Sequence, residues 1–265
     1  MTNSRKKIGL ALSGGGARGF AHIGVLKIFE ANGVKFDYVA GTSAGSIIGG
    51  ALASGMSAAE MEEMALRTGY FNMMRPSFGL KGLISTVPMD RFLRREFPVD
   101  RFEDLPIPFA AVSYNITTGS KSVHKGTGDL VQAIRASCAV PGLFAPVRDE
   151  HGDLHVDGGV TTVMPVRICR EMGADVVIGI DVLACGATLK SAPKFVFPIM
   201  VRSAMKLIQT GSAPDRADAD LIIEPRLAHL RPDQIKKRDE FIKLGELAGK
   251  EAIESVLMII GDQKI

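Results

Sequence analysis

Ser43 stands at the centre of a Gly-x-Ser-x-Gly pattern, GTSAG, which lies between a predicted strand and a predicted helix. The strand is Tyr38–Gly41, and the helix, built from small residues, is Ala44–Ser54. In a nucleophile elbow the serine occupies a sharp strand-to-helix turn that exposes its hydroxyl and tolerates only small neighbours. Gly41 and Gly45 provide those neighbours. The pattern predicts Ser43 as a nucleophile; the alternative is a serine whose side chain caps the following helix.

A glycine-rich turn, SGGGARG, joins a predicted strand, Lys7–Ser13, to a predicted helix, Phe20–Ala31. Glycine N–H groups at the start of a helix can point toward one position and bind an anion there. That anion is a phosphate or the oxyanion that develops during acyl transfer. We predict an oxyanion hole, and its residues are Gly14, Gly15, Gly16, Ala17, Arg18 and Gly19.

The same glycines also fit the Gly-x-Gly-x-x-Gly spacing of a dinucleotide-binding protein, which is one alternative function. Such a protein needs an acidic residue near the end of its second strand, where the carboxylate binds the ribose. The candidate is Asp37, but it precedes the second strand, and the end of that strand carries the Ser43 pattern instead. The sequence therefore favours the oxyanion hole over the dinucleotide site.

Arg18 lies in the first turn of the helix that follows the glycines. The helix dipole disfavours a cation at this end. The presence of Arg18 at this end indicates either an anionic ligand, such as a lipid phosphate, or a solvated side chain.

A serine nucleophile needs a base, and Asp157 is the strongest candidate. It follows a predicted strand, Leu154–Val156, and precedes Gly158 and Gly159, which allow close approach to another backbone. Burial would raise the pKa of this carboxyl group and make it a better base. We predict Asp157 as the base and the two glycines as its loop. Two alternatives remain: Asp157 caps a turn, or His155, on the same strand face, completes a triad.

Strands and helices alternate along the rest of the chain. Further strands are predicted over Ile107–Asn115, Ser120–His124, Phe144–Arg148, Asp175–Asp181 and Leu221–Glu224. Further helices are predicted over Ala58–Thr68, Asp129–Cys138, Phe195–Gln209 and Asp239–Ile260. This alternation predicts an α/β fold with a mostly parallel central sheet and helices on both of its faces.

The composition bounds the class of protein. With 265 residues and 46% hydrophobic residues, the chain is long enough for a sizeable core, and we expect a single domain over residues 6–260. A net charge of +3 is too small to indicate nucleic acid and is compatible with loose contact with an anionic membrane. Three cysteines without a metal-binding cluster predict buried thiols in a reducing compartment, and no metal site. Residues 38–59 are uncharged but contain few large aliphatic residues, so we expect no membrane span there and a cytoplasmic protein.

The segment 70–98 does not follow the alternation of strands and helices. It concentrates Phe and Met residues, basic residues and three prolines. In one interpretation it is a partly helical insertion whose apolar residues complete the core. In the other it is a mobile cap over Ser43, with its apolar residues along an acyl tunnel and Arg94 and Arg95 facing anionic lipid head groups.

The three motifs GGGARG, GTSAG and DGG, in this order, resemble those of the patatin-like phospholipase family, in particular its bacterial members. The segments GFAHIGVLKIFEANG, RASCAVPGLFAPV and GADVVIGIDV are similar to that family as well, so the resemblance covers nearly the whole chain. It implies a three-layer α/β/α fold and a Ser–Asp dyad made of Ser43 and Asp157. It also implies an oxyanion hole on the glycine turn, phospholipid or other acyl-ester substrates, and no need for a metal or another cofactor.

Together, these patterns predict a serine lipid acyl hydrolase, with transient contact at the inner membrane surface. The alternative on the same fold is a regulatory or scaffold protein with little turnover. The sequence does not predict the oligomeric state.

Overall fold

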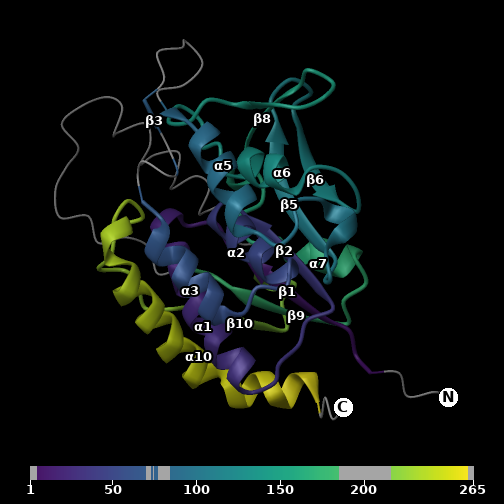
Figure 1. The fold of residues 1–265 in the computed structure, drawn as a ribbon. Coiled ribbons are helices and arrows are strands. Elements are labelled where there is room, and N and C mark those ends of the chain that lie inside the picture. Colours follow the sequence, from purple (N-terminus) through teal and green to yellow (C-terminus); the bar gives the residue numbers. More distant parts are fainter. Residues whose placement is uncertain (1–4, 70–72, 74, 77–83, 185–215, 262–265) are drawn as a thin grey trace.

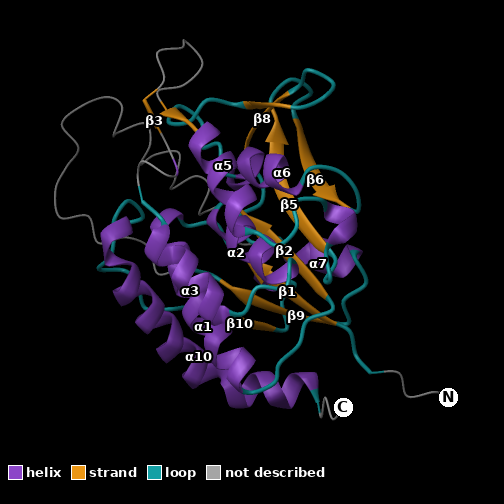
Figure 2. Ribbon diagram, in the orientation of Figure 1, coloured by secondary structure: helices purple, strands orange, loops and turns teal. Residues whose placement is uncertain are grey.

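The structure, a computed structural model, describes residues 5–69, 73, 75–76, 84–184 and 216–261 (Figure 1). In this part of the chain, helices cover both faces of an eight-stranded sheet, as Figure 2 shows. The order across the sheet is β10-β9-β1-β2-β5-β8-β7, and β6 pairs with β5. The sheet is made of β1 (Ile8–Leu12), β2 (Tyr38–Thr42), β5 (Phe109–Asn115), β6 (Ser120–Lys125), β7 (Val147–Arg148), β8 (Leu154–Asp157), β9 (Val176–Ile180) and β10 (Leu221–Ile223).

Five of the eight strands form a parallel series, which agrees with the predicted mostly parallel sheet. Each neighbouring pair in the series β10, β9, β1, β2 and β5 runs in the same direction. Because the carboxyl ends of parallel strands meet at one edge, the glycine turn after β1 and the serine turn after β2 lie at the same edge. Leu12 is in register with Gly41 on one side and with Ile180 on the other.

The rest of the sheet is antiparallel and begins at β5. Strand β6 runs along one edge of β5 from Ala110 to Asn115, so two of the predicted strands form a hairpin. The other edge of β5 is shared: β2 pairs with its first half, and β8 pairs with its second half in the opposite direction. This shared edge positions the candidate site.

The helices form two layers. They are α1 (Phe20–Ala31), α2 (Ala44–Ala53), α3 (Ala58–Arg67), α5 (Val87–Glu96), α6 (Leu130–Ser137), α7 (Val166–Glu171) and α10 (Arg238–Ile260). On one face of the sheet, Ile8, Leu10 and Leu12 belong to the main core, together with buried residues of every helix except α7. On the other face, Ala11 packs with residues of α7. The three-layer α/β/α fold is thus confirmed.

Local signals account for several helix limits. The helix α3, which was predicted over Ala58–Thr68, begins with a capping box, in which Ser57 and Glu60 each bond to the backbone N–H of the other. The long helix α10 lies along α1 (Figure 1), and the two backbones approach closely at two glycines. A Cβ atom on Gly24 would lie 2.0 Å from the carbonyl oxygen of Ile242, and one on Gly245 would lie 2.0 Å from that of Ala21.

Residues 84–98 complete the core, as the first interpretation of the segment 70–98 proposes. Met89, Phe92 and Leu93, on α5, are buried in the main core. The guanidinium of Arg94 forms ion pairs with Asp90, Asp100 and Asp129 within the fold, so the structure does not support a lipid-facing role for it. Arg95 is paired with Glu96. Phe78, Leu80 and the predicted helix Phe195–Gln209 lie outside the described residues.

One helix and two cysteines can be compared with the expectations from the sequence. The short helix α7 was not predicted, because six residues give too little periodicity to recognise. Cys138 and Cys169 are buried free thiols, as expected, whereas Cys185 lies outside the described residues. In the described residues, no helix combines the length and the apolar character needed to cross a membrane.

Candidate active site

The shared edge of β5 brings the ends of β2 and β8 together. Thr42, the last residue of β2, is in register with Val112, while Asp157, the last residue of β8, is in register with the next residue, Ser113. The two strands point toward each other along the same edge. Ser43 follows Thr42 directly, so the serine turn and the aspartate meet where the two strands end.

Ser43 has the backbone conformation of a nucleophile elbow. Its φ of 53° and ψ of −124° lie outside the helical and extended regions, and it is the only non-glycine residue with a positive φ in the described part of the chain. Its side chain makes no hydrogen bond that caps α2, so the capping alternative is wrong. Ser43 is partly exposed. A backbone outlier of this kind costs about 1–3 kcal/mol and clusters at functional sites.

The two glycines of the elbow allow the turn to pack. A Cβ atom on Gly41 would lie 2.3 Å from the carbonyl oxygen of Gly45. A Cβ atom on Gly45 would lie 2.3 Å from the carbonyl oxygen of Leu12. Both distances are far below contact distance for real Cβ atoms. Glycine is therefore needed at position 41 for the turn to close on itself and at position 45 for it to lie against β1.

Asp157 is buried, with 7% of its surface exposed. Burial raises the pKa of its carboxyl group from 3.8 to about 6, although hydrogen bonds with the Ser43 side chain and with the N–H of Gly159 act in the opposite direction. The Gly159 N–H donates to Oδ1 at 2.8 Å. A Cβ atom on Gly158 would lie 2.2 Å from the carbonyl oxygen of Val112, so this position needs glycine for the loop to cross β5.

The glycine turn lies directly beside the elbow. A Cβ atom on Gly14 would be 3.2 Å from the Cβ atom of Ser43, and one on Gly19 would be 2.6 Å from that of Ala44. Three backbone N–H groups of this turn already have acceptors. The N–H of Gly14 donates to Val163, that of Ala17 to Pro232, and that of Arg18 to Gly15.

The N–H groups of Gly15 and Gly16 lie next to each other in the same turn. Among the described residues, no acceptor binds the N–H of Gly15 or of Gly16. Gly16 has a φ of 56°, which favours glycine. Its surface is exposed, whereas Gly15 is buried against Val182. Neighbouring N–H groups in such a turn form a site for a negative charge.

Arg18 differs from both expectations for its side chain. It is 1% exposed, so it is not solvated. Its Nε and Nη2 atoms donate to the carbonyl oxygen of Leu230 at 3.0 and 2.7 Å. A further hydrogen bond of 3.5 Å joins Nη1 to the carbonyl oxygen of Val182. The guanidinium therefore joins the glycine turn to distant parts of the chain, and the role of Arg18 as a ligand for lipid phosphate is not supported.

Asp37, the candidate ribose ligand of the dinucleotide alternative, lies at the other end of the strands. One of its carboxylate oxygens accepts from the N–H of Ile8 at 2.8 Å, and the other pairs with Arg5. Ile8 begins β1, whereas the glycine turn follows the end of β1. The carboxylate of Asp37 therefore binds groups at the start of β1, away from the glycine turn.

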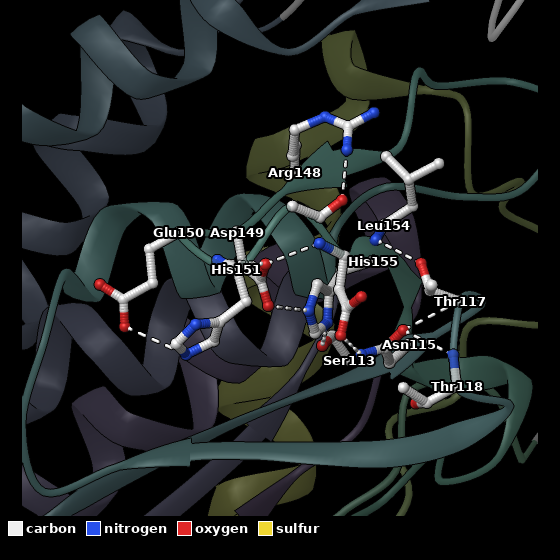
Figure 3. A network of polar contacts seen from close by, with 12 residues as sticks. Ser113, Asn115, Thr117, Thr118, Arg148, Asp149, Glu150, His151, Leu154 and His155 are labelled. Atoms are coloured by element: carbon white, nitrogen blue, oxygen red, sulfur yellow. Dashed lines mark hydrogen bonds and ion pairs between the residues drawn. The ribbon is translucent and has the colours of Figure 1, made fainter.

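The alternative base, His155, belongs to a separate polar network, which Figure 3 shows. Its Nδ1 atom lies 2.9 Å from the hydroxyl of Ser113, and its Nε2 atom lies 3.0 Å from a carboxylate oxygen of Asp149. The same hydroxyl lies 2.7 Å from Nε2 of His124. Both nitrogens of His155 are thus used away from Ser43, which argues against a triad with His155 as its base.

His22 is a packed neighbour of the glycine turn. It is fully buried, its Nε2 atom lies 2.9 Å from the carbonyl oxygen of Ser13, and burial lowers its pKa to about 4. The His22 imidazole is therefore neutral at neutral pH and adds no positive charge near the glycine turn.

Sequence reasoning assigned no role to three residues near Ser43. The hydroxyl of Ser137 accepts a hydrogen bond of 2.8 Å from the N–H of Ser43. The hydroxyl of Ser46 donates to the carbonyl oxygen of Ser43 at 2.6 Å. The Cys138 thiol hydrogen-bonds with the side chains of Ser46 and Ser43, and burial raises its pKa. The segment RASCAVPGLFAPV, which resembles the family, was the one signal that pointed to Ser137 and Cys138.

Comparison with known proteins assigns the family. The family model described as patatin-like phospholipase matches residues 10–170, which is more than half of the chain. The chain belongs to this family. Relatives of the chain occur in mammals, fungi and mycobacteria.

Two patatin-like relatives illustrate the similarity. The chain is 38% identical over 182 residues to patatin-like phospholipase domain-containing protein 6 of Mus musculus, which covers 66% of the chain and 13% of that protein. It is 37% identical over 186 residues to lysophospholipase NTE1 of Cryptococcus neoformans, which covers 67% of the chain and 11% of that protein. The chain therefore spans only a small part of the length of these relatives.

Among solved structures, VipD from Legionella pneumophila has the same fold. The TM-score is 0.56 at 15% identity, and the match covers 95% of this chain and 67% of that chain. At this identity the likeness supports the patatin-like fold and says nothing further about activity.

Proposed function

We propose that the chain is a serine lipid acyl hydrolase in which Ser43 is the nucleophile and Asp157 the base. The observation that carries the proposal is the meeting of β2 and β8 on one edge of β5. It places a partly exposed serine, in the strained conformation of an elbow, beside a buried carboxyl group whose pKa is raised to about 6. A base with a pKa near 6 is largely ionised at neutral pH and is more basic than an ordinary aspartate.

The reaction is a two-step acyl transfer. As the Ser43 oxygen attacks the ester carbonyl carbon, its proton passes to Asp157, and a tetrahedral intermediate forms. The protonated Asp157 then gives the proton to the leaving alcohol as the acyl–oxygen bond of the substrate breaks. In the second step, Asp157 takes a proton from water as the water oxygen attacks the acyl-enzyme carbonyl carbon. The acyl–Oγ bond then breaks, the protonated Asp157 returns that proton to the Ser43 oxygen, and the fatty acid is released.

The oxyanion of the intermediate binds at the glycine turn. Of the six residues from Gly14 to Gly19, we assign the donor role to the N–H groups of Gly15 and Gly16, for which the described residues offer no acceptor. Donors of this kind are worth about 3–4 kcal/mol each in comparable sites. Ala17, Arg18 and Gly19 then support the turn: Arg18 anchors it to Leu230, and Gly19 allows it to pack against Ala44.

The substrate class is a phospholipid or lysophospholipid ester. Support comes from the family and from the relatives, which are named a patatin-like phospholipase domain-containing protein and a lysophospholipase. Because such substrates reside in or on membranes, we propose a transient contact with a lipid surface, which the net charge of +3 favours when the surface is anionic. The ion pairs of Arg94 with three carboxylates argue against a part for its guanidinium in that contact.

The proposal is tested by measuring hydrolysis of p-nitrophenyl butyrate, lysophosphatidylcholine and phosphatidylcholine by the wild type and by Ser43→Ala. We expect the wild type to release acid from at least one lipid and the variant to lose activity on all three, while its circular dichroism spectrum is unchanged. Near-normal activity of Ser43→Ala would reject the nucleophile. A folded wild type that hydrolyses none of the three, and resists labelling by a fluorophosphonate, would instead favour a scaffold protein.

A further inference from the structure

The segment Ser137–Ala139, at the end of α6, contacts both residues of the proposed dyad. Ser137 accepts from the N–H of Ser43 at 2.8 Å, and the carbonyl oxygen of Ala139 accepts from the N–H of Asp157 at 2.9 Å. Between them lies Cys138, whose buried thiol is 3.9 Å from the hydroxyl of Ser46. Three consecutive residues thus join the nucleophile to the base, although Ser43 and Asp157 come from different strands.

The bond from Ser137 satisfies a backbone group that the sheet leaves without a partner. The pairing of β2 with β5 ends at Thr42, and the next position along β5 is taken by Asp157. The N–H of Ser43 therefore lies beyond the ladder. The Ser137 hydroxyl, which is completely buried, is its acceptor.

The carbonyl group of Ser43 is held separately, by the start of α2. It accepts from the N–H of Ser46 at 2.8 Å and from the Ser46 hydroxyl at 2.6 Å. The Ser43 backbone is thus fixed on both sides: Ser137 holds its N–H and Ser46 holds its carbonyl. Such two-sided support is what a left-handed, non-glycine conformation requires if it is to persist.

We propose that Ser137 is a positioning residue of the dyad. Its hydroxyl holds the Ser43 backbone in the elbow conformation, and the following two residues place that elbow at a fixed distance from Asp157. This inference rests on the proposed function, because it assigns Ser137 a role that acts through Ser43. It adds a residue from α6 to a site otherwise built from the strand ends and the glycine turn.

The test compares Ser137→Ala with Ser54→Ala. Ser54 is a matched control, because it is also buried and its hydroxyl donates to the carbonyl oxygen of Ala51 at the far end of α2. With p-nitrophenyl butyrate, we expect Ser137→Ala to lower kcat by about 10²-fold, the effect of moving a reacting group by about 1 Å. KM should change little, and the pH at half-maximal activity should stay in place, because Asp157 keeps its own bonds. Ser54→Ala should keep the kcat of the wild type.

Two further variants allow the inference to be tested even if Ser137→Ala does not fold. Ser137→Thr keeps the hydroxyl and should recover most of kcat, while Ser137→Cys offers a weaker acceptor and should give an intermediate kcat. If Ser137→Ala does not fold, the Cys and Thr variants carry the test. Wild-type kcat in Ser137→Ala or Ser137→Cys, or an equal loss in Ser54→Ala, would overturn the inference. Activity in Ser43→Ala would instead reject the proposed function itself, so the two failures are distinguishable.

Discussion

Replacement of Asp157 by asparagine should lower activity strongly and, at the same time, stabilise the fold above neutral pH. Burial raises the pKa of this carboxyl group from 3.8 to about 6. A difference of about 2 in pKa, at about 1.4 kcal/mol for each pKa unit, means that keeping the carboxylate ionised costs the folded state about 3 kcal/mol at pH 8. Asparagine carries no charge and removes this cost, but its amide N–H groups lose hydrogen bonds to water, so we expect a net gain of about 1–2 kcal/mol.

The sign of the pH dependence follows from the two pKa values. Below 3.8 the carboxyl group is protonated in both the folded and the unfolded chain, so it has no effect on stability. As the pH rises from 3.8 through about 6, the unfolded chain releases this proton first, and the wild type loses stability relative to Asp157→Asn. At about pH 5 the cost should be roughly half of its value at pH 8.

Urea unfolding of both proteins at several pH values measures this difference, and ester hydrolysis measures the loss of the base. We expect kcat of Asp157→Asn to fall by about 10²-fold or more. The control is His155→Asn, which alters another buried polar residue of β8. It should lose about 1–3 kcal/mol of stability, because Ser113 and Asp149 lose their partner, while kcat falls far less. A stability difference between Asp157→Asn and the wild type that does not change with pH would refute the reasoning about burial.

The remaining predictions concern the pH profile and the packing of the elbow. Wild-type kcat/KM for a soluble ester should rise with pH through about 6 and then level off, as the Asp157 base ionises; a profile that is flat between about pH 5 and 8 would contradict this assignment. Gly45→Ala should lower Tm by several degrees and slow fluorophosphonate labelling of Ser43, because the added Cβ atom would lie 2.3 Å from the carbonyl oxygen of Leu12. Gly69→Ala, where nothing lies within 4 Å of an added Cβ atom, should leave both unchanged; equal effects would reject the packing argument.

The parts of the site that local sequence specifies were predictable. The turn at Ser43 needs small residues on both sides, and Gly41 and Gly45 make this turn recognisable in the sequence. The parallel strands were recognised because buried runs such as Val176–Ile180 are apolar throughout. Helix limits also followed from short-range signals, such as the capping box at Ser57.

The meeting of Ser43 with Asp157 was not predictable from local patterns in the same way. It depends on the fact that β2 and β8 share one edge of β5, and this register is set by contacts between residues far apart in the sequence. The sequence pointed to Asp157 through its neighbouring glycines and through the family resemblance, without indicating this geometry.

The same limitation explains why the partners of two arginines were not predicted. Arg18 and Arg94 were interpreted from their charge and their place on a helix. Their partners are distant carbonyl and carboxylate groups: Leu230 for Arg18, and Asp129 among the three carboxylates that bind Arg94. Ser137 went unassigned for a related reason, because no spacing in the sequence relates it to the N–H of Ser43.

The central claim is that Ser43 is a nucleophile activated by Asp157, and the most direct test is the site and rate of labelling by a fluorophosphonate. After digestion, mass spectrometry should find the phosphonyl group on the peptide that contains Ser43. Labelling should be much slower in Asp157→Asn and absent in Ser43→Ala. A label on another residue, or equal rates in the wild type and Asp157→Asn, would contradict the dyad.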